Sequence, residues 1–162
     1  MINKVLIALD YNPSAQKVAE EGARLATAMQ ARIALLHVVA DATYYSSVQY
    51  SPIMGLESFG ASGLLSQETS EEIKKAAEGF LDTTRQYIGV PDADIVVEEG
   101  DFADSILEVA QRTGASVIVM GTHSRRGLDK ILMGSVAEKV LRHTTVPTYI
   151  IPTRETKGQG AQ

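Results

Sequence analysis

Residues 115–152 read ASVIVMGTHSRRGLDKILMGSVAEKVLRHTTVPTYIIP, and this stretch decides the fold. The run at 115–120 is continuously apolar and rich in β-branched residues, which is typical of a strand buried on both faces. A glycine-flanked basic loop follows at 121–133, then an amphipathic helix at 134–143 and a last strand at 146–151. A strand, a helix and a second strand in succession predict a βαβ unit of a parallel sheet.

The same alternation extends back to the N-terminus. Strands are predicted at 4–9, 31–39 and 95–97, and helices at 13–29, 69–87 and 102–113. Asn12 is the expected N-cap of the first helix, with Pro13 at its first position, and Asp101 is the expected cap of the third. The helix at 13–29 carries an apolar stripe that should face the core: Ala15, Val18, Ala19, Gly22, Leu25, Ala26 and Met29. The order β-α-β-α-β-α-β-α-β predicts an α/β fold, a single doubly wound five-stranded parallel sheet with helices on both faces.

Length and composition limit the class of protein. The chain has 162 residues, which suits one domain, and we expect that domain at 1–152. Residues 40–66, rich in Tyr, Ser, Gly and Pro, form a long variable insert, and 153–162 form a flexible tail. The absence of cysteine excludes disulfides, thiolate nucleophiles and iron–sulfur clusters. A net charge of −5 gives no basis for binding nucleic acid, and no apolar run reaches the ~18 residues of a membrane span, so we expect a cytoplasmic protein.

In open parallel sheets, ligands bind outside the carboxyl ends of the strands, where the strand order reverses. Positions directly after predicted strands are therefore candidates: Asp10, Val38, Val39, Gly100 and the run from Gly121. Gly121 leaves its strand without a side chain, so a ligand could approach the backbone closely. Gly134 and Ser135 begin a helix whose first N–H groups suit an anion, and basic side chains lie nearby. The alternative is a glycine-rich connection in which Ser135 only caps the helix and the arginines are solvated.

Here the sequence resembles the universal stress protein family. The resemblance rests on the run from Gly121 to Pro152, on VLIALD at 5–10 and on LLHVV at 35–39, and it covers residues 2–152 apart from the insert. The nucleotide-binding branch of that family carries G-x2-G-x9-G-[ST]. Gly121, Gly134 and Ser135 match it, but Ser124 stands in place of the second glycine. If that position needs φ > 0, the serine costs roughly 1 kcal/mol, which weakens binding by up to about tenfold.

The resemblance implies a site for ATP, with AMP or ADP as alternatives, and for Mg²⁺ carried with the phosphates. Asp10 would reach the ribose hydroxyls and Val38 would touch the adenine, while the residues after the fourth strand would hold the ribose and phosphates. The implied site consists of Ala8, Asp10, Val38, Met120, Gly121, Ser124, Arg126, Gly127, Gly134, Ser135 and Val136. Neither a Walker A loop nor G-x-G-x-x-G is present.

Three functions follow as hypotheses. The first is an ATP-binding stress-response module with little or no hydrolysis, because no residue beyond His123 or Asp10 could serve as a positioned base. The second is a dimeric scaffold of the same family in which Ser124 has closed the site. An unknown downstream protein is the expected partner in either case. The third, an enzyme of the nucleotide α-hydrolase type, lacks the S-G-G-x-D-S loop after the first strand.

Two further expectations concern the sheet edge and the histidines. The last predicted strand begins at Val146 and ends at Ile151, and an apolar edge strand is stable when a second copy covers it. Family resemblance likewise implies a homodimer through this strand. His37 is predicted to be a packed core histidine with one hydrogen bond, and His143 to interact with the C-terminus of its helix.

Overall fold

A single sheet of five parallel strands organises the computed structural model, which describes residues 1–40, 67–122 and 133–153. The strands are β1 (Lys4–Ala8), β2 (Arg32–Val39), β3 (Asp94–Glu99), β4 (Val117–Gly121) and β5 (Thr148–Ile151), in the order β3-β2-β1-β4-β5. The helices are α1 (Ala15–Met29), α3 (Gln67–Tyr87), α4 (Phe102–Arg112) and α5 (Ser135–His143). The predicted α/β class and parallel sheet are confirmed.

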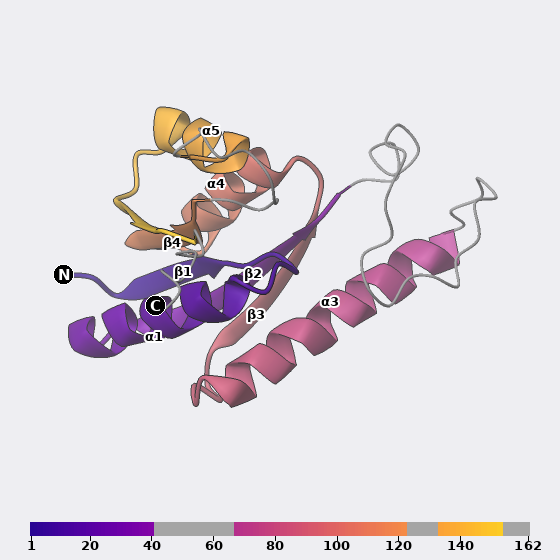
Figure 1. Ribbon diagram of the computed structural model, residues 1–162, viewed down its shortest axis with the longest axis horizontal. Helices are drawn as coiled ribbons and strands as arrows, with labels where there is room; N and C mark the ends of the chain where they lie inside the picture. The colour runs from indigo at the N-terminus through magenta and orange to yellow at the C-terminus, as the bar shows by residue number, and fades with distance from the viewer. Residues whose placement is uncertain (41–66, 123–132, 154–162) are drawn as a thin grey trace, which may run out of the picture.

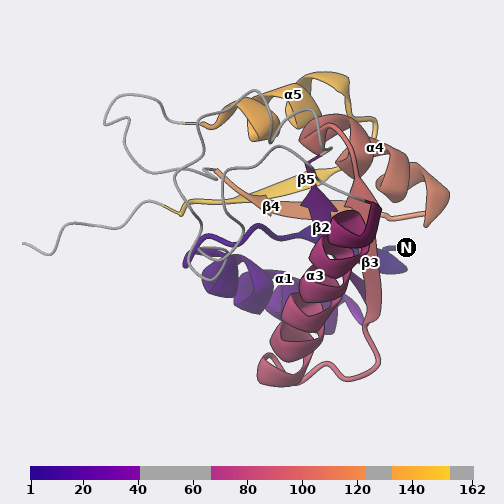
Figure 2. The same ribbon diagram turned by 90° about the vertical axis from the view of Figure 1, so that its right-hand side faces the viewer.

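Helices cover both faces of the sheet. Figure 1 shows α4 and α5 on one side and α1 and α3 on the other, and Figure 2 shows the same three layers after a quarter turn. Side chains alternate along each strand, so one face buries Val5, Ile7 and Leu35 against α1 and α3. The other face buries Leu6 and Ile118 against α4 and α5. The core is therefore two apolar layers separated by the sheet.

The start of α1 differs from the prediction. The helix begins at Ala15 with Ser14 as its N-cap, not at Pro13 with Asn12 as the cap. A hydrogen-bonded turn comes first, because the Asn12 side-chain oxygen accepts the N–H of Ser14 at 3.2 Å and the Asn12 carbonyl accepts the N–H of Ala15 at 2.8 Å. Asn12 thus satisfies a backbone donor as expected, but in a turn that delays the helix by two residues.

Of two other predicted residue roles, the core position of Met29 is wrong and the helix cap at Asp101 is confirmed. Met29 is wrong as a core residue, because it is 45% exposed on the last turn of α1. Asp101 is confirmed as the cap of α4, since its carboxylate accepts the N–H of Asp104 at 3.0 Å. Lys139 of α5 donates to that carboxylate at 3.0 Å and lies 3.0 Å from the carboxylate of Asp104, so the cap also joins α4 to α5.

Within the described ranges, no helix is both long enough and apolar enough to cross a membrane.

Candidate functional site

The strand order reverses between β1 and β4. Their register pairs Ile7 with Val119, while β1 and β2 pair Ala8 with Leu36. Asp10 lies two residues past Ala8 and three past Ile7, so continuing these registers brings Val38, Asp10 and Thr122 level at the carboxyl ends of three adjacent strands. The structure therefore brings the predicted Asp10 and Val38 together beside the end of β4. Gly100, by contrast, follows the edge strand β3 and lies away from the reversal.

Four predicted residues lie on the same face of the sheet. Val38 and Met120 are 7% and 5% exposed, and Ala8 and Val136 pack against the same apolar cluster from partly exposed positions. This cluster underlies α4 and α5, so apolar lining and the start of α5 meet on one side of the reversal. Val38 and Met120 are thus almost fully covered by protein, and Ala8 and Val136 are the predicted residues of this face that keep exposed surface.

Asp10 is the half-buried carboxylate of this region. Burial raises its pKa, and the hydrogen bond that it accepts from the N–H of Asn12 at 3.0 Å opposes that rise. One oxygen of the carboxylate thus holds the turn before α1. A carboxylate can accept more than one hydrogen bond, so this contact leaves Asp10 able to take a hydroxyl donor of a ligand as well.

The start of α5 presents backbone donors toward the same end of the sheet. The N–H of Gly134 donates to the carbonyl of Thr122 at 2.5 Å, which ties the helix to the end of β4. Gly134 is the N-cap and supplies no side-chain hydrogen bond, so the interpretation of Ser135 as a cap is wrong. Among the described residues, the N–H groups of Ser135, Val136 and Ala137 have no hydrogen-bond partner. Free donors at a helix N-terminus attract an anion.

Gly121 has a packing role that the sequence did not reveal. A Cβ at this position would lie 2.7 Å from Thr153 Cγ2 and 3.1 Å from Val18 Cγ2, so protein atoms fill the space on the α1 side. Thr153 is held there because its N–H donates to the Thr122 hydroxyl oxygen at 3.1 Å, and the two hydroxyls lie 3.2 Å apart. Lys17 Nζ also donates to the Pro152 carbonyl at 2.7 Å. No local pattern predicts contacts between segments so far apart in sequence.

Two aromatic rings, those of Tyr11 and Phe80, pack against His37 of β2. Its Nδ1 lies 2.8 Å from the carbonyl of Leu9, and because a carbonyl only accepts, Nδ1 carries the hydrogen. Burial lowers the pKa of His37, so the neutral ring is favoured. The rings of Tyr11 and Phe80 lie 4.2 Å and 5.7 Å from the His37 ring, between centroids. His37 is confirmed as a packed histidine, and His143 donates from Nδ1 to the Lys139 carbonyl at the end of α5.

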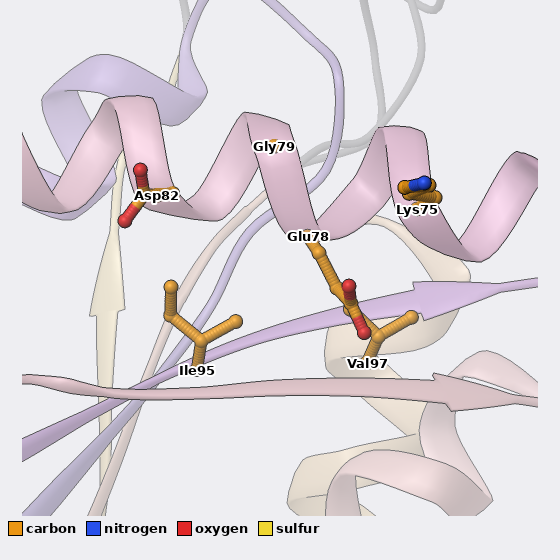
Figure 3. Close-up of a pocket in the computed structure, with 6 residues that line it drawn as sticks. All are labelled: Lys75, Glu78, Gly79, Asp82, Ile95 and Val97. Atoms are coloured by element: carbon orange, nitrogen blue, oxygen red, sulfur yellow. The ribbon is translucent and has the colours of Figure 1, made fainter.

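Some predicted residues cannot be placed. Ser124, Arg126 and Gly127, together with His123, lie outside the described residues, as does the insert at 41–66. In the part of the chain that the structure describes, no group of three His, Asp or Glu side chains could hold a metal ion. A concave region lies elsewhere, between α3 and β3 (Figure 3). The candidate site at the β1–β4 reversal is thus described by strand ends and a helix start.

Together these features define a class of protein: a doubly wound α/β domain with a potential ligand site where the strand order reverses. The chain matches the universal stress protein family over residues 1–152 and belongs to that family. It is 30% identical over 154 residues to universal stress protein YxiE of Bacillus subtilis (strain 168), covering 93% of this chain and 99% of that protein.

Solved structures share the fold. The structure of hypothetical protein MJ0577, a universal stress protein of Methanocaldococcus jannaschii, matches with a TM-score of 0.73 at 20% identity, covering 96% of this chain and 99% of that one. A universal stress protein crystallised in complex with cAMP matches with a TM-score of 0.65 at 16% identity, covering 94% and 98%.

Proposed function

We propose that this protein is a dimeric, ATP-binding stress-response module that hydrolyses ATP slowly or not at all and acts in the cytoplasm. The observation that carries the proposal is the start of α5, where three N–H groups have no partner among the described residues and the N–H of Gly134 bonds to Thr122 after β4. The adenine would lie against Val38, the ribose hydroxyls would donate to Asp10, and the phosphates would accept from the first turn of α5. One similar structure holds cAMP, which is also an adenine nucleotide.

Mg²⁺ would enter this site with the phosphates. A divalent cation commonly takes phosphate oxygens and water as ligands, so it requires no dedicated cluster of protein carboxylates. Its charge would offset that of the triphosphate where the protein supplies mainly neutral N–H groups. The low turnover follows from the same arrangement, because binding donors alone do not position an attacking water.

Calorimetric titration with ATP and Mg²⁺ tests nucleotide binding. The wild type should give a saturable heat at one nucleotide per chain. Asp10→Ala should weaken binding about tenfold, the equivalent of about 1.4 kcal/mol. AMP, ADP and cAMP titrated in parallel identify the preferred nucleotide. Prolonged incubation with labelled ATP measures turnover, and phosphate release at several turnovers per minute would contradict the binding-only proposal.

A scaffold that binds no nucleotide is the second candidate. Two observations favour it: Ser124 replaces the glycine of the family pattern, and the side chain of Thr153 fills the space beside Gly121. Ser124→Gly separates the candidates. An absence of heat from the wild type together with a saturable heat from Ser124→Gly supports the scaffold, whereas heat from both supports the ATP-binding module.

The dimer would form through β5. The N–H of Ile118 donates to the carbonyl of Pro147, so by alternation the backbone groups of Thr148 and Ile150 point away from β4, toward an edge that no described strand covers. Tyr149 is 44% exposed on the same strand. A second β5, antiparallel across a two-fold axis, would satisfy these groups. Light scattering at micromolar concentration should give twice the chain mass, and Ile150→Pro, which removes an outward N–H, should give the mass of one chain.

A further inference from the structure

The residue before Asp10 is held at both of its backbone groups by β2. The N–H of Leu9 donates to the carbonyl of Leu36 at 2.8 Å, and the carbonyl of Leu9 accepts the Nδ1 hydrogen of His37 at 2.8 Å. His37 is 5% exposed, and a hydrogen bond in such a buried place is stronger than the same bond in water. Leu9 is therefore fixed in direction as well as in position.

The peptide unit between Leu9 and Asp10 passes this constraint on to the carboxylate. A peptide unit is planar, with its carbonyl and its N–H on opposite sides, so a fixed Leu9 carbonyl also fixes the direction of the Asp10 N–H. Burial raises the pKa of Asp10, and the N–H groups of Asn12 and of Asp10 itself oppose that rise. Both donors therefore act on the Asp10 carboxylate, and the direction of one of them depends on His37.

The residue after Asp10 contacts the same histidine. The rings of Tyr11 and His37 lie 4.2 Å apart between centroids, at an interplanar angle of 43°. Phe80 lies 5.0 Å from Tyr11 and 5.7 Å from His37, and it comes from α3, which covers this side of the sheet together with α1 (Figure 1). Asp10 thus lies between two residues that both contact His37.

Packing alone does not require a histidine at this position. A phenylalanine would present a similar ring to Tyr11 and Phe80 but would offer no donor to Leu9. Burial lowers the pKa of His37, which favours the neutral ring, so the histidine brings no charge toward Asp10. What the histidine adds to a plain aromatic ring is one N–H, directed at the carbonyl that shares a peptide unit with Asp10.

We propose that His37 is a positioning residue of the ligand site: through Leu9 and Tyr11 it holds the Asp10 carboxylate in one orientation, ready to accept the hydroxyl groups of a ribose. This inference rests on the proposed nucleotide site and specifies how that site distinguishes a ribose from a sugar without hydroxyls. A carboxylate that is already oriented loses less freedom when it binds a hydroxyl, so the contact contributes more affinity.

Two substitutions separate the hydrogen bond of His37 from its ring. His37→Phe keeps a ring and removes the donor to Leu9, whereas His37→Asn keeps a donor near the position of Nδ1 and removes the ring. In ¹⁵N-labelled protein without nucleotide, acid titration of Asp10 should shift the amide signal of Asn12, because protonation weakens the 3.0 Å hydrogen bond between them. His37→Asn should keep more than half of this shift, and His37→Phe should lose more than half.

Affinity for two nucleotides gives the second measurement. ATP and 2′,3′-dideoxy-ATP differ only in the ribose hydroxyls, so the ratio of their dissociation constants reports the contact with Asp10. The wild type should prefer ATP about tenfold, and His37→Phe should reduce this preference below about threefold without weakening the binding of dideoxy-ATP. His37→Asn should restore a preference of at least about fivefold. Leu35→Val, a buried position two residues earlier on β2, controls for lost core packing and should leave the ratio unchanged.

Three results would overturn the proposal: a full ATP preference in His37→Phe, a full Asn12 shift in His37→Phe, or an equal loss of preference in Leu35→Val. Failure of the proposed function gives a different pattern. The wild type would then bind neither nucleotide, while the titration of Asn12 would still decide whether His37 orients the carboxylate of Asp10.

Discussion

Gly121 offers a quantitative test of how the end of β4 is built. In Gly121→Ala the new Cβ would lie 2.7 Å from Thr153 Cγ2, so one of the two carbons must move about 1 Å to reach an ordinary contact distance. Overpacking of this kind costs about 1–3 kcal/mol. Replacing glycine in a strand returns about 0.5–1 kcal/mol, because the unfolded chain loses freedom. The net loss should be about 1–2 kcal/mol, or about 3–6 °C in Tm.

Thr153→Ser tests whether the contact between the new Cβ and Thr153 Cγ2 causes the predicted loss of stability. Serine removes Cγ2 and keeps the hydroxyl that lies 3.2 Å from the Thr122 hydroxyl. In the double variant Gly121→Ala/Thr153→Ser the clash is absent, and only the 3.1 Å approach to Val18 Cγ2 remains. Wild type, Gly121→Ala, Thr153→Ser and the double variant form a double-mutant cycle. Urea unfolding of these four proteins should show a favourable coupling of about 1 kcal/mol between the two substitutions, with unchanged m-values. Additive losses would refute the assignment of Gly121 to packing against Thr153.

Two further predictions concern stability. Because burial lowers the folded-state pKa of His37 below its ordinary value of 6.5, the unfolded chain binds a proton first, and the free energy of unfolding should fall as the pH drops below about 6.5. His37→Asn should flatten that part of the pH profile in urea titrations, and an unchanged slope would count against His37 as its source. Asp101→Ala should lose about 1 kcal/mol of unfolding free energy with the cap of α4, whereas Asp101→Asn should retain most of it. Equal losses in both variants would mean that attraction to Lys139, and not the cap, supplies the stability.

The fold could be predicted because its signals are local. Continuous apolar runs alternate with amphipathic segments along the described chain, and that alternation alone indicates a parallel α/β sheet. The predicted starts of two elements were wrong because side-chain groups there form hydrogen bonds with backbone groups. The Thr144 hydroxyl bonds to both the N–H and the carbonyl of Val146, and Pro147 has no N–H, so β5 starts at Thr148 and not at Val146. Asn12 likewise stabilises a turn where a helix start was expected.

The positions of two candidate site residues could be predicted because strand ends can be located in sequence. Asp10 and Val38 could be placed at the carboxyl edge once the strands were known, and the order of strands then brought them together. The Thr122–Thr153 contact and the concave region between α3 and β3 could not be foreseen, since each joins segments that meet only after folding.

Backbone amide spectra of ¹⁵N-labelled protein during titration with ATP and Mg²⁺ give the most direct test of the proposed nucleotide site. Saturable shifts at Ser135, Val136 and Ala137, with smaller shifts at Val38 and Asp10, are the predicted result. Spectra that stay unchanged at these five amides with millimolar nucleotide, or shifts confined to other parts of the chain, would contradict a phosphate site at the start of α5.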